Sequence, residues 1–151
     1  MYFDGSLMKT GAGVDLVFVS PLGVRMRYAI RLHFPASNNV AEYEALVNGM
    51  RIAIELGIRR LEIRGDSRLV IDQVMKESSW HSDSMSTYCQ EVRKLEGKFH
   101  GLELKHIPRR LNEAVDALAK MASSREQVPP GVFANDQLQP SVTPKSDGNV
   151  P

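Results

Sequence analysis

The sequence predicts one α/β domain, and two observations support that fold class. The first forty residues alternate between apolar and polar side chains like β-strands, while the remainder switches between helical and extended periods. Together they give the order β-β-β-α-β-α-α-β-α. A chain of 151 residues is also long enough to bury a single core. We therefore expect five strands accompanied by helices.

Three strands precede the first helix. A short apolar strand ends at Asp4, and a second covers Val14 to Val19. The clearest strand signal is at residues 24–33, where apolar side chains alternate with basic ones. A Ser-Pro-Leu-Gly turn at residues 20–23 joins this strand to the preceding one. That turn favours an antiparallel hairpin.

The rest of the domain alternates helices with two strands, because apolar residues recur first at helical and then at extended spacing. The predicted elements are a helix that follows Asn38 and Asn39, both good capping types, and stops at Gly57, a strand at Leu61–Arg64, a helix from Ser67, a helix at about Asp83–Glu96, a strand at Leu102–Ile107 and a helix at Asn112–Ala122.

The composition changes abruptly after Ser123. Five prolines are scattered through small and polar residues in the segment that follows. Such a composition does not bury enough apolar surface to order a core of its own. We therefore predict a domain at residues 1–123 and a disordered, proline-bearing tail or linker at 124–151.

Composition sets loose bounds on location and partners. The net charge of +1 gives no general argument for a nucleic-acid partner, so any basic footprint must be local. The single cysteine, Cys89, excludes an internal disulfide and is compatible with a reducing compartment; its place on an apolar helical stripe favours packing over reactivity. No stretch reaches the roughly 18 apolar residues that span a bilayer, and the N-terminus has no signal-peptide pattern. We expect a soluble intracellular protein without a membrane partner.

Four acidic residues lie where a carboxylate is costly, beside glycine, small residues or the apolar face of a helix. They are Asp4, Glu42, Asp66 and Asp116. Each has an ordinary alternative explanation: a strand-end turn for Asp4, a first-turn acid favoured by the helix dipole for Glu42, a helix cap with Ser67 for Asp66, and a solvated helix acid for Asp116. Their shared order and contexts instead indicate a metal site.

Four short segments carry a resemblance to a known family. They are Tyr2-Phe3-Asp4-Gly5-Ser6, Asn38-Asn39-Val40-Ala41-Glu42-Tyr43, Gly65-Asp66-Ser67 and Asn112-Glu113-Ala114-Val115-Asp116-Ala117-Leu118-Ala119. In this order they resemble the four acidic motifs of type 1 ribonuclease H, most closely the ribonuclease H domains of plant Ty3/gypsy-type retroelement polyproteins. The resemblance implies a five-stranded mixed sheet flanked by helices and cleavage of the RNA strand of an RNA–DNA hybrid.

The resemblance also implies a cofactor. Two Mg²⁺ ions, roughly 4 Å apart, would activate water and neutralise the leaving oxygen, with Mn²⁺ as a possible substitute. Asp4 would bridge both ions, Asp116 would help hold the ion that activates water, and Glu42 and Asp66 would hold the other. The products would carry 5′-phosphate and 3′-hydroxyl ends.

Further residues match substrate-contacting positions of the family, and an adjacent reverse transcriptase domain is the implied partner. The matching positions are Gly5, Ser6, Asn38, Asn39, Arg68 and Arg109. Asn38 and Asn39 would read the 2′-hydroxyls of the hybrid, with helix capping as the alternative role. Arg109 would contact phosphate from the loop where many relatives place a histidine, with a solvated basic turn as its alternative.

Two other functions stay open at this point. A catalytically inactive relic could retain the fold and bind nucleic acid or nothing, and a first strand that begins shortly before Asp4 favours it. An interaction module on the same fold would need no acidic quartet, so the four carboxylates argue against that class. The intact quartet favours the enzyme.

Overall fold

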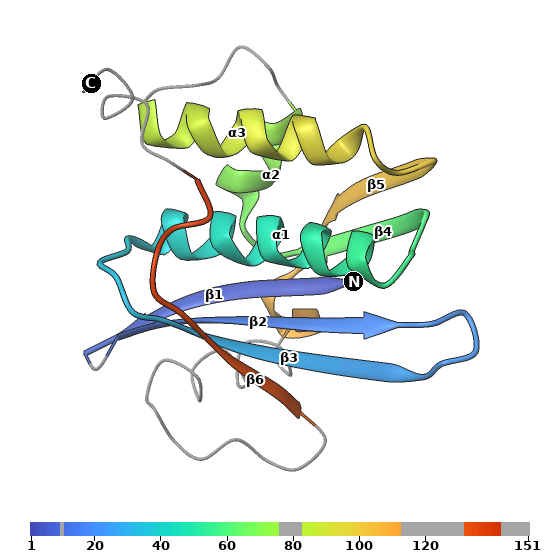
Figure 1. Ribbon diagram of the computed structural model, residues 1–151, viewed down its shortest axis with the longest axis horizontal. Helices are drawn as coiled ribbons and strands as arrows, with labels where there is room; N and C mark the ends of the chain where they lie inside the picture. Colours follow the sequence, from blue (N-terminus) through green and yellow to red (C-terminus); the bar gives the residue numbers. More distant parts are fainter. Residues whose placement is uncertain (10, 76–82, 113–131, 143–151) are drawn as a thin grey trace.

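Six strands form one mixed sheet in the order β5-β4-β1-β2-β3-β6 (Figure 1). The computed structural model describes residues 1–9, 11–75, 83–112 and 132–142. Its strands are β1 Tyr2–Met8, β2 Gly11–Val19, β3 Arg25–Leu32, β4 Arg60–Gly65, β5 Gly101–His106 and β6 Val132–Gln137. Its helices are α1 Asn38–Glu55, α2 Arg68–Met75 and α3 Asp83–Glu96, and a 3₁₀ turn covers Arg109–Asn112.

The sheet is antiparallel at its centre and parallel toward both edges. β1, β2 and β3 pair antiparallel, as the predicted hairpin requires. The pairs β1–β4, β4–β5 and β3–β6 are parallel. β1 therefore has a partner on each side, and it forms hydrogen-bonded pairs with both from Tyr2 onward. This central strand carries Asp4.

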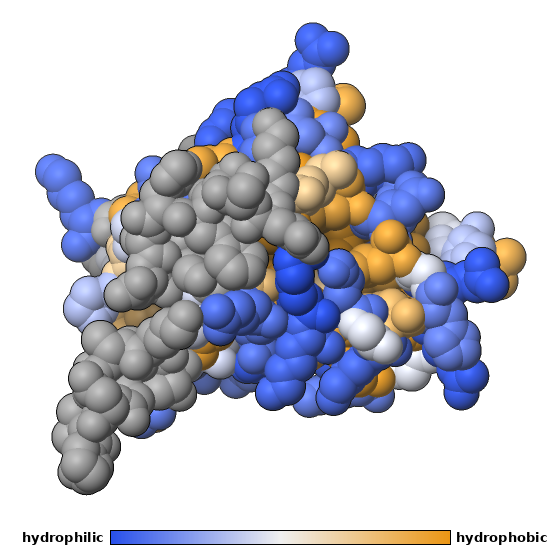
Figure 2. All heavy atoms as spheres, turned by 90° about the horizontal axis from the view of Figure 1, so that it is seen from above, coloured by the Kyte–Doolittle hydropathy of each residue, from blue (hydrophilic) through white to orange (hydrophobic). Residues whose placement is uncertain are grey.

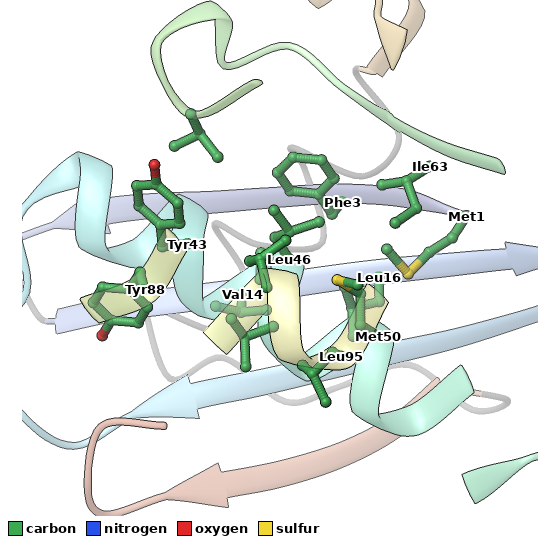
Figure 3. Close-up of a cluster of buried hydrophobic side chains, with 14 of the residues drawn as sticks. Met1, Phe3, Val14, Leu16, Tyr43, Leu46, Met50, Ile63, Tyr88 and Leu95 are labelled. Atoms are coloured by element: carbon green, nitrogen blue, oxygen red, sulfur yellow. The ribbon is translucent and has the colours of Figure 1, made fainter. Parts of the chain in front are cut away.

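The core lies between the sheet and α1, and α3, above α1 in the view of Figure 1, packs against α1. Phe3 and Leu16 from the sheet and Leu46 and Met50 from α1 are fully buried in one cluster (Figure 3). Burial of such side chains is worth about 1.5–3 kcal/mol each, so this cluster fixes α1 firmly over β1 and β2. Cys89 is also buried, in α3, as its apolar stripe predicted.

The structure confirms the α/β class and the order of the elements that it describes, with one correction. The sheet has six strands instead of five, because residues 132–137 from the predicted disordered tail form β6 along the edge of β3. Short polar segments gain strand structure by pairing with an existing edge, which composition alone does not reveal. The predicted helix Asn112–Ala122 beyond its first residue, and the division between 123 and 124, lie outside the described residues.

The exterior mixes hydrophilic and hydrophobic groups. On the face shown in Figure 2, hydrophilic side chains occupy most of the rim and hydrophobic ones gather nearer the middle. Within the described ranges, no helix has both the length and the apolar character needed to cross a membrane.

Candidate metal centre

Parallel pairing of β1 with β4 brings two of the predicted acids together. Phe3 is paired with Gly65, so the residues that follow them, Asp4 and Asp66, come side by side at the carboxyl end of β4. Gly65 is needed here because a Cβ at that position would lie 2.4 Å from the Phe3 ring. Carboxyl ends of parallel strands are where open α/β sheets place their ligands.

Glu42 reaches the same place from α1, because Gly5 lets the helix approach β1 closely. A Cβ on Gly5 would lie 2.4 Å from the carbonyl carbon and oxygen of Ala41. Across this contact the Gly5 N–H donates to Oε1 of Glu42 at 2.7 Å. Gly5, which is predicted to contact substrate, therefore also positions Glu42.

Serines, not the acids or asparagines, cap the two helices at the site. The Ser37 hydroxyl accepts from the Val40 N–H at 3.2 Å, so Asn38 and Asn39 lie inside the first turn of α1 and the capping role suggested for them is wrong. The Ser67 hydroxyl likewise accepts from the Val70 N–H at 3.4 Å at the start of α2. Asp66 is thereby left available as a ligand.

The three acids form one compact cluster. Asp4, Glu42 and Asp66 each offer a carboxylate oxygen, and these oxygens lie within 4.8 Å of one another. Asp4 is 1% exposed, Glu42 is 8% exposed, and the side chain of Asp66 is 3% exposed. Concentrating three carboxylates away from water is costly unless a cation compensates them.

Asp66 shows most directly that the site fits a metal ion. Among the described residues neither of its buried oxygens accepts a hydrogen bond, and its charged neighbour, Arg109, places Nε 3.9 Å from Oδ2. An all-oxygen donor set of this kind suits hard divalent cations such as Mg²⁺ and Mn²⁺. These three residues would hold the ion.

Glu42 carries the electrostatic strain of the cluster. Burial raises its pKa from 4.5 to about 8, and the negative charge of Asp66 adds to the increase. The Gly5 N–H, a hydrogen bond with Asp4 and the charge of Arg109 oppose it. Glu42 is therefore largely protonated at neutral pH until a cation binds.

A polar cleft of about 300 Å³ opens beside the carboxylates and collects most of the predicted substrate residues. It is lined by Gly5, Ser6, Leu7, Asn38, Asn39, Glu42, Asp66, Ser67 and Arg109. Arg109 is 70% exposed at the cleft, where a phosphate would be accessible to it. Arg68 is exposed at the start of α2 and does not line the cleft. Asp116, the fourth predicted acid, lies outside the described residues.

Two residues near the site were not anticipated. Asn112 is fully buried and donates to the Phe3 carbonyl at 3.1 Å, which ties the segment leading toward Asp116 to β1. Asp15 is also fully buried and pairs across the sheet with Asp4. Its signal was present in the sequence as an acid inside the apolar run from Val14 to Val19.

A mixed sheet whose central strand β1, neighbouring strand β4 and covering helix α1 bring three carboxylates together is typical of the ribonuclease H-like class. The sequence model of the family described as "Reverse transcriptase-like" matches residues 2–122, and the chain belongs to this family.

Relatives of this chain include ribonucleases H. It is 36% identical over 123 residues to ribonuclease HI of Halobacterium salinarum; the match covers 80% of this chain and 62% of that protein, so this chain spans about three fifths of the relative's length. The crystal structure of RNase H1 from that archaeon superposes with a TM-score of 0.69 at 33% identity, covering 82% of this chain and 96% of the other. The N-terminal RNase H domain of Rv2228c from Mycobacterium tuberculosis gives a TM-score of 0.69 at 27% identity, covering 82% and 91%.

Proposed function

We propose that this protein is an endoribonuclease that hydrolyses the RNA strand of RNA–DNA hybrids with two divalent metal ions, Mg²⁺ or, as a substitute, Mn²⁺. The observation that carries the proposal is the convergence of Asp4, Glu42 and Asp66 within 4.8 Å. Asp116 would be the fourth ligand. Ribonuclease HI is the activity named for the Halobacterium relative, which supports the same assignment here.

The chain's own residues would divide the work as follows. Bound divalent ions would lower the pKa of water and neutralise charge on the scissile phosphate. Asp4, on the central strand, has a carboxylate oxygen within 4.8 Å of oxygens of Glu42 and Asp66, and it would hold the ions together with them. The Gly5 N–H holds Glu42 in position, and burial of the cluster keeps competing water away from the carboxylates.

The cleft suits a hybrid duplex more than a sequence-specific ligand. Asn38 and Asn39 line it with amide groups that would pair with 2′-hydroxyls in a wide minor groove, and Gly5 and Ser6 would lie near the scissile phosphate. Arg109 would bind a phosphate beside the carboxylates, and Arg68 would contact the nucleic-acid strand from the start of α2. The products would carry 5′-phosphate and 3′-hydroxyl ends.

We also infer that the domain derives from a retroelement polyprotein of the plant Ty3/gypsy type and works beside a reverse transcriptase domain. The four motif segments support this, as does the description of the matching family. Reading the genomic sequence on either side of the coding region tests it. A reverse transcriptase frame joined to this chain is expected, and a stand-alone gene with unrelated neighbours would refute the inference.

The activity is tested with a labelled RNA–DNA hybrid of defined sequence. With Mg²⁺ the RNA strand should be cut internally, while all-RNA and all-DNA duplexes of the same sequence stay intact. Asp66→Asn should lower the rate roughly 100-fold or more, since even residues that merely support a metal ligand cost 10- to 100-fold. The matched control is Asp72→Asn, the same change in α2 away from the cleft.

Each failure has its own meaning. An uncut hybrid in Mg²⁺ and in Mn²⁺, from a protein that still binds metal, would identify the inactive relic. Equal cutting by the Asp66→Asn variant would point to a contaminating nuclease. Cutting of the DNA strand would refute the substrate assignment while leaving the metal centre intact.

A further inference from the structure

The segment that follows residue 131 returns to the folded domain. β6 pairs in parallel with β3 over the whole of Val132–Gln137, and the His33 N–H continues the pairing by donating to the Gln137 carbonyl at 2.8 Å. Phe133 stacks on Tyr28 with ring centroids 4.9 Å apart. From the end of β6 the chain leaves the sheet edge and passes α1 toward α3 (Figure 1). Two different layers of the domain therefore contact it.

A buried carboxylate lies at the point where this segment crosses α1. Glu44 is 0% exposed, although it belongs to a residue type that is rarely buried without partners. Its Oε1 accepts from the Gln137 side-chain amide at 2.9 Å and from the Ser141 hydroxyl, and its Oε2 accepts from the Ser141 N–H at 2.8 Å. The segment thus supplies three donors to this one carboxylate.

The domain supplies the other donors to Glu44. Tyr88 of α3 donates its hydroxyl to Oε2 at 2.5 Å, and the Asn48 amide, one turn along α1, reaches Oε1 at 3.3 Å. Without the segment these two would be the donors left to Glu44 among the described residues. Removing hydrogen-bond donors from a buried carboxylate costs free energy, so the state with the segment bound is favoured at this site.

A second set of contacts fixes the end of the segment. Arg51 donates to the Ser141 carbonyl at 3.0 Å and pairs with Glu91 of α3 at 2.9 Å. The Asn48 amide also donates to the Gln137 side-chain oxygen at 3.0 Å. Val142 then packs against the hydrophobic core. The domain thus contacts both the backbone and the side chains of the segment, as proteins that recognise extended peptides do.

We propose that the β3 edge and the floor formed by Glu44, Asn48 and Arg51 are a peptide-binding site, occupied in cis by residues 132–142 of this chain. The ligand class is an extended peptide that pairs with β3 as a parallel strand. The last residue of that strand is a glutamine. Four residues later comes a serine whose N–H and hydroxyl both donate hydrogen bonds. Glutamine and serine suit the floor because Glu44 accepts hydrogen bonds and has no proton to give when ionised.

Helix geometry separates this site from the metal centre. Glu42 and Glu44 are two residues apart on α1, so their side chains leave the helix about 200° apart. Glu42 turns toward β1 and the metal cleft, whereas Glu44 turns toward α3 and residues 137–142. The peptide site is therefore testable without reference to catalysis.

The test uses the full chain with a specific protease site inserted between residues 124 and 131. After folding and cleavage, the C-terminal fragment should stay bound to the domain in gel filtration at micromolar concentration. A labelled synthetic peptide of residues 131–143 should exchange with it. Glu44→Gln should weaken retention at least tenfold, and Ser141→Ala several-fold. Glu55→Gln, at the exposed end of the same helix, is the matched control and should retain the fragment fully.

Hydrogen exchange on the intact chain tests the same contacts even if the cleaved protein unfolds. The β6 amides that point toward β3, every second one from Phe133 to Gln137, and the amide of Ser141 should exchange at least tenfold more slowly than those of unstructured peptides. Glu44→Gln should accelerate exchange at Ser141 selectively. Complete release of the fragment from a domain that remains folded, or unprotected amides in the intact chain, would overturn the proposal. A concentration-dependent dimer whose segments exchange between copies would overturn occupation in cis.

Discussion

The backbone N–H of Gly5 donates to Oε1 of Glu42 at 2.7 Å, and this bond joins the central strand to α1 at the carboxylate cluster. It exists because the helix and the strand approach so closely that a side chain at residue 5 would overlap the Ala41 carbonyl. A glycine and a glutamate that lie 37 residues apart in sequence therefore set the width of the carboxylate cluster.

Gly5→Ala should damage both the fold and the site. The new Cβ would lie 2.4 Å from backbone atoms of Ala41, which do not move without shifting α1. We expect a loss of about 1–3 kcal/mol in the free energy of unfolding, the usual range for overpacking. The rate of hybrid cleavage should fall at least tenfold. Thermal unfolding and cleavage assays measure the two effects.

Gly97→Ala is the matched control for this substitution. A Cβ at residue 97 comes no closer than 3.7 Å to its nearest neighbour, the Lys94 carbonyl oxygen. It should leave stability and rate nearly unchanged. Wild-type activity in Gly5→Ala would mean that the close approach of α1 does not govern the position of Glu42.

Metal binding should release a proton from Glu42. Its pKa in the metal-free protein is raised from 4.5 to about 8. Between these two pH values Glu42 ionises readily only in the unfolded state, so the metal-free protein loses stability as the pH rises from about 4.5 to 8. A bound cation needs the carboxylate form. Apparent Mg²⁺ affinity should therefore increase between about pH 6 and 8, at most tenfold per pH unit, and level off above.

The rise in melting temperature on adding Mg²⁺, followed across this pH range, measures the affinity change. Calorimetry in two buffers with different ionisation heats counts the released protons. Glu42→Gln should remove the pH-dependent step and weaken binding, whereas Glu55→Gln should retain both. Binding without proton release at pH 7 would contradict the assignment of Glu42 as a titrating ligand.

Local signals in the sequence were enough to place the three described acids. Asp66 follows an apolar strand as predicted, whereas Asp4 lies inside β1, which continues to Met8 instead of ending at Asp4 because residues 5–8 pair with β2. Parallel pairing of β1 with β4 brings the two acids together. Glu42 lies on the inward stripe of a helix that apolar spacing identifies. The family resemblance then linked the three into one site, and Asp116 stays a prediction.

The parts that were missed depend on long-range or competing contacts. β6 has no strand signal strong enough to outweigh the prolines and polar residues around it. It forms through pairing with β3 and is held by the contacts of the following residues with Glu44, which lies 97 residues from Ser141 in sequence. Ser37 displaced Asn38 as the cap of α1 because two adjacent residues of capping type compete for one position. Such choices are settled by tertiary structure.

Asp15→Asn should stabilise the protein at neutral and alkaline pH. Asp15 is 0% exposed, and burial raises its pKa from 3.8 to about 9 against smaller opposing effects of the Leu16 N–H and Arg27. The contribution of protonated Asp15 to the free energy of unfolding is fully present below about pH 4. It is lost as the pH rises toward 9, because in that range Asp15 ionises readily only in the unfolded state. The neutral amide avoids this loss, with a gain on the order of 2 kcal/mol at pH 8.

Urea unfolding of wild type and Asp15→Asn at pH 4 and pH 8 measures this effect. The two proteins should be similar at pH 4 and separate at pH 8. Asp72→Asn, the same change at a partly exposed position in α2, controls for the substitution itself. A loss of stability at pH 8 would mean that Asp15 is ionised and compensated in the folded protein.

Arg109→Ala should weaken substrate binding more than catalysis. The guanidinium lies in the polar cleft with Nε 3.9 Å from Oδ2 of Asp66, and it is 70% exposed, so a backbone phosphate can reach it. We expect KM for the hybrid to rise several-fold with a smaller change in kcat. The slope of log affinity against log salt concentration should decrease in magnitude by about one, as expected for the loss of one phosphate contact.

The neighbouring residue provides a matched control, because Arg110 carries the same charge in the same 3₁₀ turn but does not line the cleft. Arg110→Ala should leave KM and the salt slope nearly unchanged. Arg109→Ala should also move the Glu42 pKa further upward, since the positive charge at residue 109 lowers it in the wild type. Equal effects of the two substitutions would mean that Arg109 contributes only nonspecific electrostatic attraction and makes no specific phosphate contact. An effect confined to Arg109 would instead place the hybrid backbone beside Asp66, within reach of the three carboxylates.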